Sequence, residues 1–319
     1  MKKMKNSYHC EGLVYQHALE AKVSGEKSKK PGTEYITGTV DIATDDDCTN
    51  IVQVHYTYVT PLTNKGTENK TYTVLANILN GTFGNVMANG KENAVKVRVD
   101  TGIALNDFYS DRTNEMVAAK RNEGGFIHTT GPWATDDLGK NRFEVDMVIT
   151  GIKRQEADPE KDLPEKGILH GCIFDSYRNT MYPMDFSVLN PKAIDYFEGE
   201  EPSPKHPLFT RLKGKEVSAT IKKKITEESA FGEPIVREVI NSRKDFVVDW
   251  AQTDPYEWDT EDTITAEELS QLMADREVHL ADVKRRYDEN KAAKSGGTSF
   301  DNTPAPAPAT KSSATNFDF

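Results

Sequence analysis

The chain has 319 residues, of which 36% are hydrophobic and 9% aromatic, and its formal net charge at pH 7 is −11. This length and composition support a sizeable core and favour two domains with appendages. The sequence contains no run of 18 apolar residues, which excludes a helical membrane span, and no apolar segment follows the basic N-terminus, so we expect no signal peptide.

The acidity is concentrated at the C-terminal end. Residues 252–319 contain 14 acidic and 7 basic residues, so the rest of the chain is close to balanced and can carry a basic face. The cysteines, Cys10, Cys48 and Cys172, are far apart and odd in number. They argue against a disulfide framework and a zinc site, and favour a reducing, cytoplasmic setting.

The first half of the body is predicted to be rich in β-strands. Residues 1–33 suggest an N-terminal arm, either mobile or docked as a strand. Segments 35–43 and 51–59 alternate around a polar turn and predict a hairpin. Strands are also expected at 71–75, at 94–110 with a bulge at Gly102, and at 126–130, with a helical turn and loop at 115–125. Together, residues 34–140 form a first β-rich module.

Residues 141–251 show a more specific order of elements. Three strand-like segments, 143–152, 167–177 and 181–189, precede a short helical piece at 192–198 that follows Asn190 and Pro191. Two further strands are predicted at 208–213 and 216–226, and one more at 246–250. Three strands, a short helix and two strands fit a Greek-key barrel of the OB type. Direct residue matching shows no convincing repeat between the two modules.

The C-terminal part changes character. Within the acidic segment 252–294, Thr265 and Glu268 form a capping box, and apolar residues follow at helical spacing to about residue 290. This amphipathic helix is compatible with an oligomer contact, a cover on the body, or part of a tether. Residues 295–319, rich in Gly, Pro and Ala, predict a disordered linker that ends in an aromatic tip. The predicted fold class is therefore mainly β, with OB-like Greek-key barrels, a C-terminal amphipathic helix and a disordered tail.

A basic stretch and nearby aromatic residues provide the candidate site. Residues 205–224 hold seven Lys or Arg against one acid, Glu216, and Phe174, Tyr177, Tyr182 and Phe209 are close in sequence. Phosphates attract cations and unstacked bases attract flat rings, so this combination suits single-stranded nucleic acid. The candidate residues are Lys153, Arg154, Tyr177, Arg178, Tyr182, Arg211, Lys213, Lys215, Lys222 and Lys224.

Simpler interpretations stand beside this one. The charge run is equally compatible with a solvated face, and successive lysines on a strand point to opposite sides. Aromatic residues pack in cores more often than they stack on bases, although Tyr177 and Tyr182 flank a turn with Arg178, which favours partial exposure.

The layout of β-barrel body, linker and acidic-aromatic C-terminus resembles single-stranded DNA-binding proteins, particularly those of bacteriophages. In the bacterial family an acidic tip ending in Pro-Phe docks replication and repair partners. Here Phe319 matches, but the tip has one acid, Asp318, and no penultimate Pro. The resemblance implies that Phe317, Asp318 and Phe319 bind replication or recombination proteins. It further implies that the protein coats exposed strands in the host cytoplasm.

Motifs for catalysis are weak. The segment 84–91 has five residues between its glycines, one too many for a P-loop, and neither HExxH spacing nor a Gly-x-Ser-x-Gly elbow occurs. We therefore expect a non-catalytic protein without metal or cofactor. Two alternatives stay open: a β-rich virion component of tail or baseplate that assembles with its own copies, and a nucleic-acid enzyme with dispersed carboxylates.

Overall fold

The computed structural model describes residues 4–26, 28–159, 163–227, 235–258 and 263–295, with side chains throughout except at 137–138, 219–243 and 294–295. The strands are β1 (Asn6–His17), β2 (Glu20–Val23), β3 (Glu34–Ala43), β4 (Ile51–Val59), β5 (Lys96–Tyr109), β6 (Met116–His128), β7 (Asn141–Gln155), β8 (Lys166–Asp175), β9 (Thr180–Val188), β10 (Leu208–Glu227) and β11 (Ile235–Ala251). The helices are α1 (Lys70–Leu79), α2 (Val86–Asn89), η1 (Lys91–Asn93), α3 (Asp137–Lys140), α4 (Pro191–Gly199) and α5 (Ala266–Ser295).

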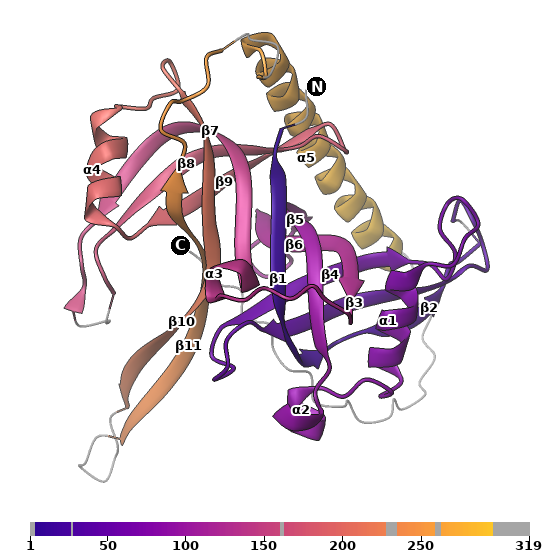
Figure 1. The fold of residues 1–319 in the computed structure, drawn as a ribbon. Coiled ribbons are helices and arrows are strands. Elements are labelled where there is room, and N and C mark those ends of the chain that lie inside the picture. The colour runs from indigo at the N-terminus through magenta and orange to yellow at the C-terminus, as the bar shows by residue number, and fades with distance from the viewer. Residues whose placement is uncertain (1–3, 27, 160–162, 228–234, 259–262, 296–319) are drawn as a thin grey trace.

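The N-terminal half closes into a barrel of five strands (Figure 1). β1 pairs with β3 and β3 with β4, all antiparallel. The chain then passes through α1 and returns as the β5–β6 hairpin. β6 pairs with β4 in parallel and β5 pairs with β1, which closes the barrel. The short β2 is added outside, on β3.

The second half repeats this strand order. β7, β8 and β9 form an antiparallel meander, α4 follows, and β10 and β11 form a hairpin. β11 pairs with β9 in parallel and β10 pairs with β7. Both halves are thus five-stranded Greek-key barrels of the OB type with a helix between their third and fourth strands. The repeat exists in the topology, although residue matching does not detect it.

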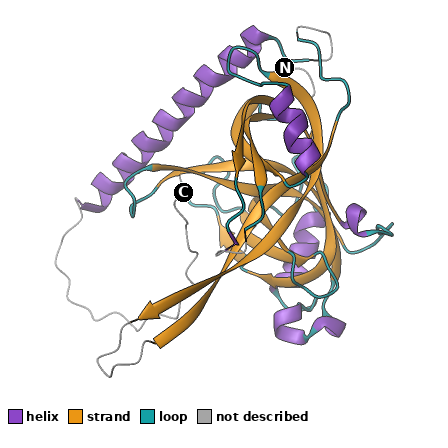
Figure 2. Ribbon diagram, turned by 90° about the vertical axis from the view of Figure 1, so that its left-hand side faces the viewer, coloured by secondary structure: helices purple, strands orange, loops and turns teal. Residues whose placement is uncertain are grey.

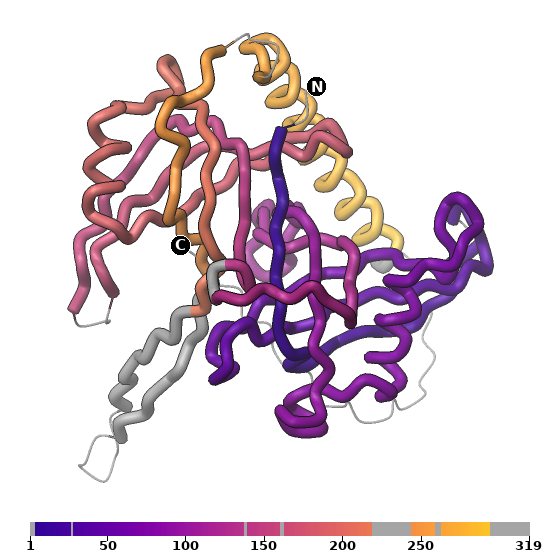
Figure 3. The backbone as a smooth tube through the Cα atoms, in the orientation of Figure 1, coloured from indigo at the N-terminus to yellow at the C-terminus, as the bar shows by residue number. Residues whose placement is uncertain are grey.

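β1 belongs to both barrels. Beyond its partners in the first barrel, residues 6–10 pair with β7 of the second barrel. The tube view shows it running from one barrel to the other (Figure 3). Just before β1, the backbone NH of Met4 donates to Ser176 Oγ (2.8 Å) and that of Lys5 donates to Asp146 Oδ2 (2.6 Å). The segment considered as an arm therefore supplies a central strand, because its apolar residues Tyr8, Cys10 and Val14 are buried in the core.

Two helices occupy equivalent places in the two barrels. α1 begins at Asn69 and α4 at Asn190, and each Asn side chain accepts a backbone NH as N-cap. α4 confirms the predicted helical piece, whereas the predicted strand at 71–75 is wrong. Its β-branched residues mimic a strand, but the cap and the spacing of the buried Leu75 and Ile78 direct a helix.

Other boundaries also differ from the sequence predictions. The hairpin at 35–59 is confirmed, and so is the irregularity at Gly102, where the β5–β6 register shifts. The helical turn predicted at 115–125 is wrong, because this segment is the partly exposed strand β6. The two strands predicted at 208–226 are one strand, β10. Gly214 within it marks a bulge: a Cβ there would lie 2.0 Å from the carbonyl oxygen of Val247.

The C-terminal helix α5 contacts β9 of the second barrel and β5 of the first. Figure 2 shows it as the long helix along one side of the molecule. Thr265 and Glu268 form the predicted capping box: the backbone NH of each residue donates to the side-chain oxygen of the other, at 3.1 Å in both cases. Ile264 and Leu272 pack on an apolar cluster outside the barrel core, made of Met4, Val148, Cys172, Phe174, Met181 and Phe209. No helix among the described residues has the length and apolar character needed to cross a membrane.

Candidate nucleic-acid interface

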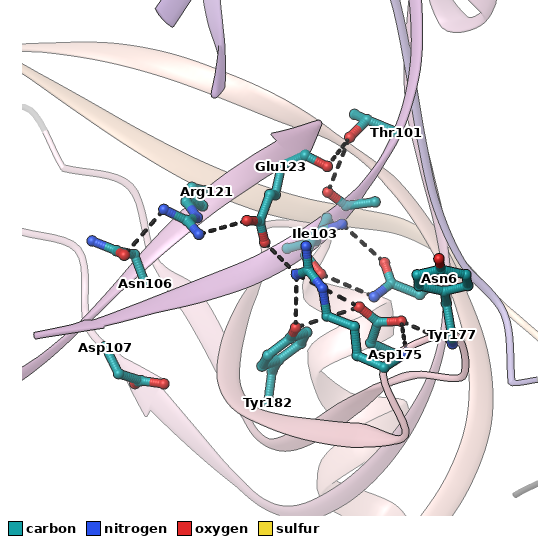
Figure 4. A network of polar contacts seen from close by, with 12 residues as sticks. Asn6, Thr101, Ile103, Asn106, Asp107, Arg121, Glu123, Asp175, Tyr177 and Tyr182 are labelled. Carbon is teal, nitrogen blue, oxygen red and sulfur yellow. Dashed lines mark hydrogen bonds and ion pairs between the residues drawn. The ribbon is translucent and has the colours of Figure 1, made fainter. Parts of the chain in front are cut away.

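A cleft of about 700 Å³ lies between the two barrels. β1, β5 and β6 of the first barrel form one wall, and the β8–β9 turn of the second barrel forms the other (Figure 4). The lining includes two permanent cations, Lys5 and Arg178, and three carboxylates, Asp100, Glu123 and Asp175. The cleft is therefore close to balanced in charge rather than strongly basic.

Two exposed aromatic rings line this cleft. Phe126 on β6 is 69% exposed and Tyr177 in the β8–β9 turn is 95% exposed. The turn is held by Asp175, whose Oδ1 accepts the backbone NH of Tyr177 (2.9 Å) and of Arg178 (3.0 Å). Large rings without a packing partner are costly to leave in water, and they are suitable platforms for unstacked bases.

A network of ion pairs crosses from one barrel to the other beside these rings (Figure 4). Glu123 on β6 accepts from Arg178 Nη1 of the β8–β9 turn (2.5 Å) and from Arg121 Nη2 (2.7 Å). Burial would raise the pKa of Glu123, but hydrogen bonds and charge from Arg178 and Arg121 hold that pKa below its ordinary value. The carboxylate stays ionised and ties the two barrels together.

The cleft continues into two further cavities. Glu123 and Arg178 also line a pocket of about 450 Å³ that α5 borders with Arg276 and His279. Leu105 joins that pocket to a hollow of about 610 Å³ over β8 and β9, where Lys120 Nζ donates to the carbonyl oxygen of Asp185 (2.5 Å). We call the three together the interbarrel groove. It follows the outer face of β8 and β9, and in OB barrels the face of the second and third strands is the one that binds oligonucleotides.

The basic residues predicted on β10 lie elsewhere, on an outer strip that borders β7. Arg211 Nε donates to the buried Asp146 (2.7 Å), and Lys213 Nζ is 3.7 Å from Glu144 and 4.6 Å from the centre of the Trp250 ring. Lys215 is exposed. Arg211 and Lys213 therefore already have acidic partners, since β7 places carboxylates opposite them.

Two other predicted residues lie near the end of β7. Lys153 is exposed. Arg154 donates to Asp195 (2.5 Å) and Glu198 (2.9 Å) on α4 and lies 3.3 Å from Glu165. Arg154 thus ties α4 to the barrel, at a place separate from both the groove and the β10 strip.

Of the predicted residues, Tyr177, Arg178 and Tyr182 line the interbarrel groove. The partial exposure expected for Tyr182 is wrong, because its ring is buried in the second barrel's core, where it points inward with Met184 and Phe186. Only its hydroxyl reaches the network, 3.4 Å from Asp175 Oδ2, and burial raises its pKa. Its ring cannot stack on a base. Phe174 and Phe209 are also core residues rather than stacking platforms, since both side chains are buried.

Several predicted residues fall outside what the structure describes. The side chains of Lys222 and Lys224 are among these, although their backbone belongs to β10 and pairs with Ile240 and Glu238 of β11. Phe317, Asp318 and Phe319 lie outside the described residues altogether.

The sequence reasoning missed several residues of the groove, among them Phe126, Arg121, Arg276, His279, Lys5 and Lys120. Arg121 and Phe126 belong to β6, where Gly124 and Gly125 suggested a loop. Strand alternation of Val117, Ala119 and Arg121 was a signal that could have found it. Within the described part of the chain, no three His, Cys, Asp or Glu residues gather in a way that could hold a metal ion.

Comparison with known proteins places the chain in a family. Curated protein sequences give no significant match. Among solved structures, the wild-type single-stranded DNA binding protein from Thermus aquaticus aligns with a TM-score of 0.45 and 8% identity, over 83% of this chain and 97% of that one. A deletion mutant of it aligns with a TM-score of 0.44 and 7% identity, over 81% and 98%. The YorF family model matches residues 5–286, and the chain therefore belongs to the YorF family.

Proposed function

We propose that the protein is a non-catalytic single-stranded DNA-binding protein that holds the strand in the interbarrel groove. The observation that carries this proposal is the pair of exposed rings, Phe126 and Tyr177, in a cleft between two barrels of OB topology. Fold alone does not fix function, and the proposal therefore depends on the chemistry of this cleft.

The groove combines the two contacts that an unpaired strand needs. The rings of Phe126 and Tyr177 offer faces for base stacking, which every base can use, so binding tolerates many sequences. Lys5, Lys120 and Arg178 along the same course offer charge to phosphates. Binding releases counterions from the strand, so the affinity falls as salt rises.

We extend the proposal to a role in covering exposed strands during phage DNA replication or recombination. In this role Phe317, Asp318 and Phe319 recruit other proteins of the process. Support comes from the chain's own layout, a β-barrel body followed by a Pro-rich stretch and an aromatic tip. Removal of residues 295–319 then abolishes pull-down of the partner and leaves DNA affinity equal or higher.

The direct test is fluorescence anisotropy with a labelled poly-dT oligonucleotide, compared with duplex DNA and RNA of equal length. Phe126→Ala and Tyr177→Ala should each weaken poly-dT binding by roughly tenfold, because one stacked base contributes about 1–3 kcal/mol. Tyr58→Ala is the matched control: this ring is 47% exposed but stacks on Tyr35 and lies outside the groove. If all three variants bound poly-dT as tightly as the unmodified protein, the groove would be excluded as the binding surface.

The outer strip on β10 is the competing location on the same protein. Lys213→Glu and Lys215→Glu reverse charge there without touching the groove. If these variants lose binding while Phe126→Ala and Tyr177→Ala keep it, the strand binds on the strip. No binding of poly-dT by the unmodified protein at low salt would refute the function itself.

A further inference from the structure

The pocket beside the cleft gathers three arginines from three separate parts of the chain. Arg121 comes from β6, Arg178 from the β8–β9 turn and Arg276 from α5, and all three line the same cavity of about 450 Å³. His279, one turn further along α5, lines it too. We call this cavity the arginine pocket.

The carboxylates in the arginine pocket are fewer than the cations. Arg121 and Arg178 share one carboxylate, Glu123. Arg276 and His279 share another, Asp107, with Arg276 Nη2 at 2.7 Å and His279 Nε2 at 3.4 Å. Asp175, which lines the neighbouring cleft, adds only a longer contact: its Oδ2 lies 3.8 Å from Arg178 Nη1. Three permanent positive charges therefore face two carboxylates within the pocket.

One donor in the pocket has no acceptor. Arg121 Nε is buried and has no hydrogen-bond partner among the described residues, whereas its Nη1 donates to Asn106 Oδ1 (3.0 Å) and its Nη2 donates to Glu123. A buried donor without a partner is costly, and more so on a charged group. A purely structural ion-pair network would balance its charges and satisfy its donors. This network has one positive charge in excess and one buried NH without a partner among the residues that the structure describes.

We propose that the arginine pocket binds a phosphate group, with α5 as one of its walls. Guanidinium groups present paired NH donors that match the oxygens of phosphate, and the surplus positive charge selects an anion. The pocket shares Glu123 and Arg178 with the cleft that holds Phe126 and Tyr177. The identification of the ligand as a backbone phosphate of a bound strand rests on the proposed function; a free polyphosphate has the same chemistry.

The test uses the full chain with Arg121→Gln and Arg178→Gln. Each change removes one guanidinium and leaves Glu123 paired with the other, so the fold is retained, as circular dichroism can verify. Arg154→Gln is the matched control, because Arg154 also sits among carboxylates but lies beside α4, outside the groove.

In the first arm, poly-dT binding is measured by anisotropy at four salt concentrations. We expect both pocket variants to bind about tenfold more weakly and to lower the slope of log K against log salt by about 0.7, the value for one lost phosphate contact on a single strand. Arg154→Gln should change neither. If the unmodified protein binds and the pocket variants bind with unchanged affinity and slope, the pocket is not a phosphate site for the strand.

In the second arm, thermal unfolding is followed with millimolar pyrophosphate at constant ionic strength. Stabilisation of the unmodified and Arg154→Gln proteins, lost in the pocket variants, supports the phosphate site even if poly-dT does not bind, in which case the proposed function fails alone. Equal response of all four proteins in both arms overturns the phosphate site.

Discussion

The two barrels share one strand order but differ in the chemistry of their outer faces. On the first barrel, Asp41 of β3 accepts hydrogen bonds from Gln16 of β1 and Gln53 of β4, both at 2.8 Å, so the outer face is polar and satisfied by its own side chains. On the second barrel the corresponding face carries Val148, Cys172, Phe174, Met181 and Phe209. A repeated topology thus does not imply a repeated surface.

This difference explains the position of α5. An apolar outer face must be covered, and residues Ile264, Leu269 and Leu272 provide the cover. Beyond the cover, the helix continues to the first barrel, where Arg276 pairs with Asp107 and the Tyr287 ring packs on Tyr109, with centroids 4.7 Å apart. The helix that the sequence predicts is therefore part of the fold of the second barrel and a brace between the two.

The largest effect is expected where the cover is removed from the second barrel. Leu272→Ala should lower the free energy of unfolding by about 2–5 kcal/mol, since Leu272 is buried against the apolar outer face. Urea unfolding measures the change. Met273→Ala is the control on the same helix, because Met273 is 54% exposed, and should leave the midpoint nearly unchanged. Similar losses for both variants would contradict a covering role confined to one face of α5.

A second prediction concerns the junction of the barrels. Glu216 on β10 is buried, and its Oε2 accepts from Asn122 Nδ2 on β6 (2.6 Å). Burial raises the pKa of Glu216 above its ordinary value of about 4.5, although the charge of Lys244 and the Asn122 bond oppose this. The folded state then favours the protonated acid, so Glu216 makes stability fall as pH rises from about 4.5 through the raised folded pKa.

Glu216→Gln should remove this contribution, because the amide oxygen still accepts from Asn122 and carries no charge. The unfolding temperatures of the variant and the unmodified protein should converge at acidic pH and separate as pH rises, with the variant more stable. Glu144→Gln, on the exposed strip, serves as the comparison. A constant difference across pH would mean that folding does not raise the pKa of Glu216.

The smallest effects test the equivalence of the barrels. Asn69→Ala and Asn190→Ala each remove the N-cap of the helix between the third and fourth strands. Each should cost about 1 kcal/mol in chemical denaturation. Asn85→Ala, at the cap of the short α2 that buries no residue, should cost less. If one of the two matched caps proved far more costly than the other, the helices would not play the same part.

The sequence predicts the second barrel better than the first, and particular residues show why. Asn190 and Pro191 predict the start of α4, whereas Asn69 is followed by β-branched residues whose local preference favours a strand. Gly214 suggests a break between two strands, yet β10 is continuous there: its register with β11 shifts, and the backbone of β11 approaches too closely for a side chain. Only long-range pairing reveals such a contact.

The candidate site was harder to predict than the fold. Residues close in sequence differ in environment: Tyr177 in the β8–β9 turn is exposed, whereas the ring of Tyr182 on β9 is buried. The basic residues of β10 meet carboxylates of β7 that are some 65 positions away. The groove is lined by β6, the β8–β9 turn and α5, which are far apart in sequence. The charge and ring content of a single stretch of sequence therefore cannot predict that they meet.

The pairing of β1 with strands of both barrels has a consequence for the proposed binding of a strand. Modules joined by a loose tether adapt their spacing to the ligand, and their joint affinity depends on the tether. Here a continuous backbone ladder connects the modules. The distance between the two barrels is therefore fixed by the fold. If the interbarrel groove holds a strand as proposed, the number of nucleotides covered by each molecule should stay the same whatever the salt or protein density.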